Sequence, residues 1–310
     1  TPTFLNERQL DKLFGIIHRN FYLLPDAEAT CEANPEGVGD AKLKLLKREG
    51  INRMSLGVQS FNDGHLKYLG RNHDALLALE TFKRIRKAGF DNVNVDVMFS
   101  FPGQTMGDLQ RDISQVIQLN SEHVSLYSLM IEKNSRFHAK NIELQDDVLQ
   151  VQQYHFVCDA LGEAGIQQYE VSNFAVPGKA SKHNLNYWQS GRYIGLGVGA
   201  HSYIGNRRSW NIPRLIPYIS SLQESKSPQE DFEEIGPFDE FKEFVLFGLR
   251  MNEGVDLPKA GDRFGCSFDA ARSKKIDSLI EEGFLIQDHG CLLATAQGRL
   301  VLDEICSQII

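Results

Sequence analysis

The chain has 310 residues, 42% of them hydrophobic and 24% charged, a composition typical of two or three folded domains with apolar cores. Its net charge of −8 disfavours nonspecific binding to nucleic acid, because nucleic-acid phosphates attract proteins rich in lysine and arginine. No apolar run approaches the roughly 18–20 residues of a membrane-spanning helix, and no secretory signal is visible. We therefore expect no integral membrane segment and no nucleic-acid partner.

The cysteines are odd in number and scattered along the chain: Cys31, Cys158, Cys266, Cys291 and Cys306. This pattern indicates free thiols in a reducing compartment rather than a disulfide framework, so we expect a cytoplasmic protein. No CxxxCxxC or CxxC motif occurs. The chain itself therefore offers no recognisable thiolate cage for a metal or an iron–sulfur cluster.

Four short segments of the first half alternate apolar with polar or small residues: 29–34, 53–60, 92–100 and 123–129. A period of two marks β-strands with two different faces. Because a helical pattern follows each segment, we expect parallel strands covered by helices on one side. The apolar faces must meet those helices, which leaves Glu32, Gln59 and Asp96 on the other face. A sheet lined in this way is suited to holding a ligand.

Helices are expected between and after these strands, over residues 41–49, 75–88, from 105 and over 148–164. Asp74 is a candidate N-cap, and the segment from Thr105 to Asp108 resembles a capping box. In the second of these helices one apolar stripe is expected, formed by Leu76, Leu79, Phe82 and Ile85. The spacing of the strands, about 25–40 residues, is the spacing that repeated βα units require.

The character of the sequence changes after residue 166. A strand is expected at 167–175, a glycine-rich strand or loop at 192–210, and a surface helix with a linker at 213–228. From about residue 231 two helices (239–251 and 269–282), a hairpin and a last helix resemble a winged-helix arrangement. With 17 acidic and 8 basic residues from Glu230 onward, this part disfavours DNA and favours protein packing or a lid. The expected domains are 1–165, 166–228 and 229–310.

The residues on the polar face suggest a binding site. Asp96 is costly to bury near the end of its strand unless it is paired, hydrogen-bonded or solvated. The C-terminal strand ends carry the ligand site in α/β barrels, and Arg71 lies on a loop at the same rim. Carboxylates accept from hydroxyls or an ammonium group, and an arginine grips a carboxylate, so a ligand with hydroxyls and an amino-acid zwitterion fits. An internal salt-bridge network is the alternative interpretation.

Four motifs in this order resemble the radical S-adenosylmethionine (SAM) superfamily: Glu32-Ala-Asn-Pro35, Ser55-Leu-Gly-Val-Gln-Ser-Phe61, Leu69-Gly-Arg71 and Asp96 followed by Phe101-Pro-Gly-Gln-Thr105. The resemblance covers nearly the whole chain. The branch concerned contains oxygen-independent coproporphyrinogen III oxidase and a haem chaperone. It implies an α/β fold with a partial (β/α) barrel, four of its six units present, followed by a small β-containing segment and a C-terminal winged-helix-like domain.

The resemblance also implies roles for single residues. Gln59 and Asp96 would hold the ribose hydroxyls of SAM. Arg71 would hold its carboxylate, and Glu32 its amino end or a neighbouring hydroxyl. The segment Thr1-Pro-Thr3 is similar to the tail of a glycine-rich family segment that binds the methionine end of SAM.

The sequence departs from the family pattern in one respect. The CxxxCxxC loop that binds the [4Fe–4S] cluster of the family precedes the glycine-rich segment, so it would lie upstream of Thr1. We therefore expect the chain to be a piece of a longer protein, with the cluster present in the intact protein only. The polypeptide as given is expected not to cleave SAM.

A second group of candidate residues lies in the segment from His183 to Trp188, which has the pattern HNxxYW. An exposed His183 could ligate haem iron while Tyr187 and Trp188 pack on the macrocycle. The pattern resembles a segment typical of the haem-chaperone branch. A structural role of the histidine is the alternative, and His201 is a weaker second candidate.

The resemblance implies a haem chaperone that binds haem and SAM and passes haem to an unknown acceptor protein. The alternative is an oxygen-independent coproporphyrinogen III oxidase of porphyrin biosynthesis, so whether the protein is an enzyme stays open. A third interpretation is a barrel whose winged-helix-like tail binds partners or nucleic acid without a cofactor. The acidic tail and the polar sheet face count against it.

Overall fold

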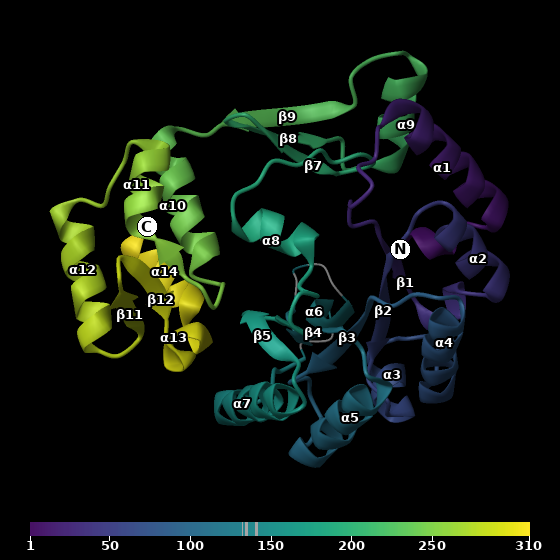
Figure 1. The fold of residues 1–310 in the computed structure, drawn as a ribbon, viewed down its shortest axis with the longest axis horizontal. Coiled ribbons are helices and arrows are strands. Elements are labelled where there is room, and N and C mark those ends of the chain that lie inside the picture. The colour runs from purple at the N-terminus through teal and green to yellow at the C-terminus, as the bar shows by residue number, and fades with distance from the viewer. Residues whose placement is uncertain (132, 134–135, 140–141) are drawn as a thin grey trace. The chain divides into compact units, whose positions relative to one another are not determined.

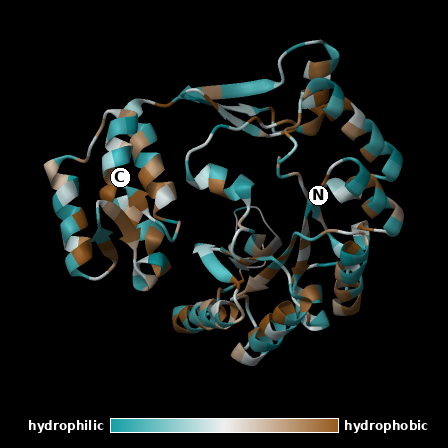
Figure 2. Cartoon of the chain, in the orientation of Figure 1, coloured by the Kyte–Doolittle hydropathy of each residue, from teal (hydrophilic) through white to brown (hydrophobic). Residues whose placement is uncertain are grey.

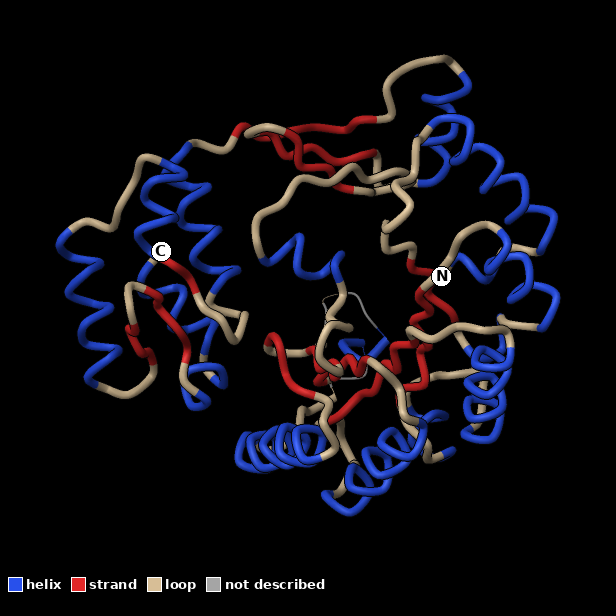
Figure 3. The backbone as a smooth tube through the Cα atoms, in the orientation of Figure 1, coloured by secondary structure: helices blue, strands red, loops and turns tan. Residues whose placement is uncertain are grey.

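The structure is a computed structural model that describes residues 1–131, 133, 136–139 and 142–310. It divides into two compact units, Thr1–Ala180 and Ser181–Ile310. Figure 1 gives the order of the elements, and Figure 3 separates helices, strands and loops. The division falls after Ala180; domain boundaries after residues 165 and 228 stay predictions.

A six-stranded sheet with the order β1-β2-β3-β4-β6-β5 forms the first unit. Its strands are β1 (Thr30–Ala33), β2 (Arg53–Gln59), β3 (Val93–Phe99), β4 (His123–Ser128), β5 (Gln167–Glu170) and β6 (Asn173–Ala175). Strands β1 to β4 pair in parallel, whereas β6 is antiparallel to both β4 and β5. The four predicted parallel strands are therefore confirmed. Within the described residues β1 and β5 end the sheet, which is open rather than closed.

The helical elements of the first unit are η1 (Pro2–Phe4), α1 (Glu7–Asn20), η2 (Pro35–Gly37), α2 (Asp40–Arg48), α3 (Asp63–Tyr68), α4 (Ala75–Lys87), α5 (Met106–Leu119), α6 (Arg136–Ala139) and α7 (Asp147–Glu163). Figure 1 shows α2, α4, α5 and α7 along one side of the sheet. The valines of β3, Val93, Val95 and Val97, are fully buried in the core on this side. The apolar face of each parallel strand therefore meets helices, as the period of two predicts.

Two predicted helix starts are confirmed by their hydrogen bonds. The Asp74 carboxylate accepts from the Leu77 amide at 2.8 Å. Thr105 and Asp108 form a reciprocal capping box, with Asp108 N donating to Thr105 Oγ1 at 3.2 Å and Thr105 N donating to Asp108 Oδ2 at 2.9 Å. Such caps stabilise a helix by about 1 kcal/mol each. They fix the start of α4 after the loop that follows α3 and the start of α5 after the loop that follows β3.

Two local predictions are wrong. Leu76 is 64% exposed, because the buried side of α4 runs through Ala78, Thr81, Phe82 and Ile85 instead. Residues 167–175 are a hairpin of β5 and β6 rather than one strand. Its tight turn is stabilised by the buried Glu170 carboxylate, which accepts from the Ser172 amide at 2.9 Å.

The second unit begins with α8 (Lys182–Trp188) and continues with β7 (His201–Ile204), β8 (Arg207–Asn211), α9 (Leu215–Gln223) and β9 (Gln229–Glu234). The three strands form an antiparallel sheet in the order β7-β8-β9. Figure 2 shows β9 as a mostly hydrophilic strand, and all six of its residues are exposed. A charged edge strand of this kind resists pairing with other chains.

The rest of the second unit consists of α10 (Pro237–Gly248), β10 (Val255–Asp256), α11 (Leu257–Phe264), α12 (Ala270–Glu281), β11 (Leu285–Asp288), β12 (Cys291–Ala294), α13 (Ala296–Leu300) and α14 (Leu302–Ile309). Its sheet has the order β10-β12-β11. The helices, hairpin and last helices of the winged-helix prediction are therefore present, with α11 as an additional helix. Among the described residues, every helix is too short or too polar to span a membrane.

Candidate functional site

The polar face of the six-stranded sheet carries two rows of residues set by strand register. The lower row runs across the four parallel strands as Glu32, Ser55, Asn94 and His123. The upper row, two residues further along, contains Gly57, Asp96 and Ser125. The apolar residues between the rows face the helices. Polar side chains from strands far apart in sequence are therefore neighbours on one surface.

Asn94 is the centre of the hydrogen-bond network on this surface and is almost fully buried. Its Nδ2 donates to Ser55 Oγ and to Asp96 Oδ1, both at 2.7 Å. Its Oδ1 lies 2.7 Å from His123 Nδ1 and accepts from Ser125 Oγ at 3.2 Å. One buried amide thus orients the Asp96 carboxylate relative to three strands.

Burial shifts the ionisation of two members of this network. Burial, and to a smaller extent the negative charge of nearby Glu32, raises the pKa of Asp96 to about 6, against the opposing effect of hydrogen bonds from Asn94, Ser125 and Ser55. Burial, and to a smaller extent the positive charge of Arg53, holds the pKa of His123 well below its usual value.

A neutral His123 has one donor and one acceptor nitrogen. Asn94 Oδ1 can only accept, so His123 Nδ1–H is the donor at 2.7 Å. His123 Nε2 then accepts from the Tyr169 hydroxyl at 2.9 Å. The tautomer follows from the partners, and the network needs no charged histidine.

Three of the residues predicted to bind SAM share the polar face. Glu32 is exposed on β1, Asp96 is largely buried on β3, and Gln59 at the end of β2 is 7% exposed. Gln59 has a φ of 71°, a left-handed conformation that is uncommon outside glycine and is often found at functional sites. Arg71 lies half-buried on the loop after α3, where its amide donates to Leu66 O at 2.9 Å. In the described part of the chain no polar contact joins its guanidinium to the other three.

A histidine that the sequence analysis did not select lies between these segments. The side chain of His73 is fully buried, with Nε2 3.1 Å from Val58 O and Nδ1 3.3 Å from Glu36 Oε2. These contacts connect the loop of Arg71, the residue before Gln59 and the segment that follows β1. His73 lies two residues after Arg71, and this closeness was the one sign in the sequence that it belongs to the site. Its contacts are with residues distant in sequence, so they leave no local pattern.

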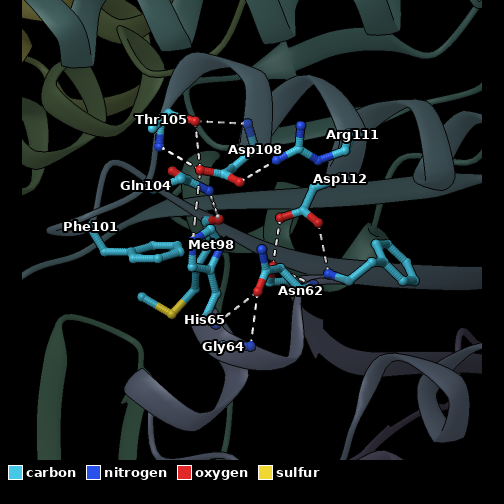
Figure 4. A network of polar contacts seen from close by, with 12 residues as sticks. Asn62, Gly64, His65, Met98, Phe101, Gln104, Thr105, Asp108, Arg111 and Asp112 are labelled. Carbon is cyan, nitrogen blue, oxygen red and sulfur yellow. Dashed lines mark hydrogen bonds and ion pairs between the residues drawn. The ribbon is translucent and has the colours of Figure 1, made fainter.

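The residues just after β2 and β3 are held by α5 and by the loop before it; Figure 4 shows Asp112 of the helix and Gln104 of the loop. The Asp112 carboxylate accepts from Ser60 Oγ and from the Phe61 amide, both at 2.7 Å. Gln104 Oε1 accepts from the Ser100 amide at 2.8 Å and so closes the turn after β3. The segment that carries Gln59, the rim of the sheet at the end of β2, is therefore held in place by the buried Asp112 carboxylate.

The HNxxYW segment lies on α8, a helix capped by Ser181, whose hydroxyl accepts from the Asn184 amide at 3.3 Å. His183 is exposed, and its ring meets the Tyr187 ring edge-on at a centroid distance of 4.7 Å. Trp188 turns to α10 instead, where its ring lies 6.2 Å from that of Phe247. The structure therefore brings His183 and Tyr187 together and places Trp188 in the packing between two helices.

A cavity of about 260 Å³ lies beside Trp188 in the second unit. It is lined mainly by apolar ring atoms, from residues that include Tyr187, Trp188, Tyr193, Tyr203 and Phe247. Ligand pockets generally measure about 300–1,000 Å³, so this cavity is too small to enclose a haem. A haem on α8 would lie on the exposed side, where His183 is. The second candidate, His201, is on β7 and stacks on Trp210 at 5.9 Å.

The residues present do not fit an iron–sulfur cluster. Among the described residues no three His, Cys, Asp or Glu side chains are grouped to hold a metal ion. All five cysteines are free thiols, and burial raises the pKa of Cys31 and that of Cys306 to about 11. A cluster is bound by thiolates, whereas the raised pKa keeps Cys31 and Cys306 as neutral thiols.

Comparison with known proteins agrees with this fold. The profile of the radical SAM superfamily matches residues 3–116, and that of the HemN C-terminal domain matches residues 237–301. The structure superposes on coproporphyrinogen III oxidase HemN of Escherichia coli with a TM-score of 0.88 at 24% identity, covering 100% of this chain and 75% of that one. The class of protein is thus a radical SAM protein with a HemN-type C-terminal domain.

Relatives found by sequence identify the family within this class. The chain is 36% identical over 310 residues to the haem chaperone HemW of Bacillus subtilis, covering 98% of this chain and 82% of that protein. It is 34% identical over 318 residues to HemW of Lactococcus lactis, covering 98% and 83%. The chain belongs to the radical SAM superfamily and, within it, to the family of the haem chaperone HemW.

Proposed function

We propose that this chain carries the SAM-binding surface and the haem-binding helix of a haem chaperone that passes haem to an acceptor protein in the cytoplasm. Membership of the HemW family, together with an exposed His183 in an HNxxYW segment, is the observation that carries the proposal. The free cysteines are consistent with a reducing compartment.

On this proposal the polar face of the sheet binds SAM, a ligand with a reactive sulfonium group. Asp96 and Gln59 hold the ribose hydroxyls, Arg71 grips the carboxylate and Glu32 takes the ammonium group. The fit is supported by Asn94, which donates to Asp96 Oδ1 at 2.7 Å and so orients the carboxylate before the ligand arrives. No step through an iron–sulfur cluster is assigned to this chain, because its own cysteines do not fit one.

Haem binds on the exposed side of α8 in this proposal. His183 would supply an imidazole nitrogen to the haem iron, and the neighbouring Tyr187 ring would pack against the macrocycle. Trp188 contributes indirectly and does not contact haem. Its ring packs against Phe247, and the Arg250 guanidinium lies 4.5 Å from the ring centroid. It holds α8 on α10 while His183 faces solvent.

Titration of the chain with haemin tests the haem site. A stoichiometric shift of the Soret band is expected, with an affinity at least tenfold weaker in His183→Ala. His289→Ala is the matched control, because the His289 side chain is 95% exposed and far along the sequence in the β11–β12 turn. Equal affinity and an equal spectrum in His183→Ala would remove His183 as the ligand. Absence of any shift in the unsubstituted chain would remove the haem-binding part of the proposal.

Oxygen-independent coproporphyrinogen III oxidation is the second candidate function, favoured by the fold shared with HemN. Anaerobic incubation with coproporphyrinogen III, SAM and a reductant, after iron–sulfur reconstitution, is a one-way test of this candidate, because only the formation of product decides between the two functions. We expect no oxidised product, because the cysteines present do not fit a cluster. Formation of the divinyl product by this chain would favour the enzyme.

A further inference from the structure

A second cavity in the second unit differs in chemistry from the ring-lined cavity described above. It measures about 380 Å³ and shares Ser190, Gly191 and Tyr203 with the ring-lined cavity. Its other wall residues include Arg192 and Arg263. The turn that follows α8 therefore borders both an apolar space and a space lined by two guanidinium groups, which we call the arginine cavity.

The two guanidinium groups have hydrogen-bond donors to spare. Arg263 donates to Gln189 O and to Ser190 O, each at 3.3 Å, which leaves part of its five N–H donors unused. Arg192 is exposed, and among the described residues nothing forms a hydrogen bond or an ion pair with its guanidinium. Both cations can therefore bind an anion in the arginine cavity.

One carboxylate, that of Glu240, also lines the arginine cavity. It accepts a hydrogen bond from the Tyr203 hydroxyl, and burial together with this contact raises the pKa of Tyr203 to about 12. The tyrosine therefore stays protonated at neutral pH and remains the partner of Glu240. Because one carboxylate faces two guanidinium groups, the cavity keeps a net positive charge, which favours a carboxylate ligand.

The turn that carries Arg192 is held in one conformation. Gly191 N donates to Asn186 O at 2.7 Å, and Asn186 Nδ2 donates to Arg192 O at 3.2 Å. Ser190 has a φ of 51°, a left-handed conformation that is uncommon outside glycine and is often found at functional sites. Its hydroxyl is buried and has no hydrogen-bond partner among the described residues. Buried polar groups are normally hydrogen-bonded, so this hydroxyl is a donor available to a ligand.

Contacts between aromatic rings connect the turn with His183. The ring centroids of His183 and Tyr187 are 4.7 Å apart, and those of Tyr187 and Tyr193 are also 4.7 Å apart. Tyr193 directly follows Arg192 in the sequence. We therefore expect one edge of a flat ligand that is bound at His183 and rests on Tyr187 to lie near this turn.

We propose that Arg192 and Arg263 bind a propionate of the haem whose iron is coordinated by His183. The inference rests on the proposed haem site and adds the orientation of the haem to it. Haem carries its two propionates on one edge, and a guanidinium binds a carboxylate through two parallel N–H bonds. A single axial nitrogen lets the macrocycle rotate about the iron–nitrogen bond, whereas a second contact at the edge fixes that rotation. The Ser190 hydroxyl is a further donor for the same carboxylate.

Haemin and haemin dimethyl ester test the role of the propionates. The ester has the same iron and macrocycle but no carboxylate, so it can use His183 and cannot pair with the arginines. We expect the unsubstituted chain to bind haemin about tenfold more tightly than the ester in titrations followed at the Soret band. Equal affinities for the two compounds would overturn the proposal.

Arg192→Gln tests the cation. Its guanidinium is exposed and engages no described residue, so the substitution should leave the fold intact. We expect haemin to bind about three- to tenfold more weakly, while ester affinity and the Soret position stay the same because His183 is unchanged. Arg214→Gln removes the same charge from an exposed arginine before α9 and is the matched control. Equal haemin affinity in Arg192→Gln and in this control would overturn the role of Arg192.

The outcomes separate this inference from the proposed haem site. A chain that does not bind haemin, or that binds it equally well after His183→Ala, removes the haem site and the propionate contact with it. Haemin binding that depends on His183, but is equal for the ester and unchanged in Arg192→Gln, leaves the haem site standing and overturns the propionate contact.

Discussion

The two candidate sites are held by different kinds of interaction. On the sheet of the first unit, ligand-facing groups are held by a buried polar network centred on Asn94. On α8 of the second unit, His183 is exposed and its surroundings are ring contacts, with Tyr187 edge-on at 4.7 Å. A ligand with many polar atoms needs oriented donors and acceptors, whereas a metal-centred flat ligand needs one nitrogen and apolar area. The difference teaches that the first site depends on the sheet and the second on one short helix.

The largest expected effect is that of Asn94→Ala. The substitution removes the two hydrogen bonds that the Asn94 side chain donates and the two that it accepts. Its buried partners, among them Asp96, Ser55 and His123, each lose one hydrogen bond. We expect the free energy of unfolding to fall by about 3 kcal/mol. Urea unfolding checks this, with Asn20→Ala as the exposed control. A loss below about 1 kcal/mol would show that the network is not what holds this face together.

Asp96→Asn should have an opposite and pH-dependent effect on stability. The folded-state pKa of Asp96 is raised from 3.8 to about 6, so ionising it costs stability as the pH rises through 6. Asparagine removes that cost, which is at most about 3 kcal/mol above pH 7 and vanishes below pH 4. Thermal unfolding at pH 5 and pH 8 should therefore show a larger gain at pH 8, while SAM binding weakens. An equal gain at both pH values would contradict the raised pKa.

Trp188→Leu should have the smallest effect and should be confined to the second unit. It removes the ring that lies against Phe247 and under Arg250, a loss of about 1–2 kcal/mol. We expect haem to bind more weakly because α8 is less firmly held, with SAM binding unchanged. Parallel titrations with haemin and SAM measure both. A loss of SAM affinity as well would show that the two sites are not independent.

The sequence predicted the parallel strands because their apolar and polar residues alternate, and it predicted α4 and α5 because their caps are local. It did not predict the hairpin of 167–175, since the turn at Val171-Ser172 has neither glycine nor proline. The resemblance selected Gln59 and Asp96, and the register places Asp96 beside Gly57. His73 was missed because its contacts join segments distant in sequence.

The hydrogen bond from the Phe61 amide to the Asp112 carboxylate makes movement of the rim measurable in solution by hydrogen–deuterium exchange. That amide hydrogen is sequestered by a buried acceptor on another element rather than by a neighbouring strand. It can exchange with deuterium only when the end of β2 separates from α5. Its exchange rate therefore reports the opening of the rim that carries Gln59, separately from the unfolding of the sheet.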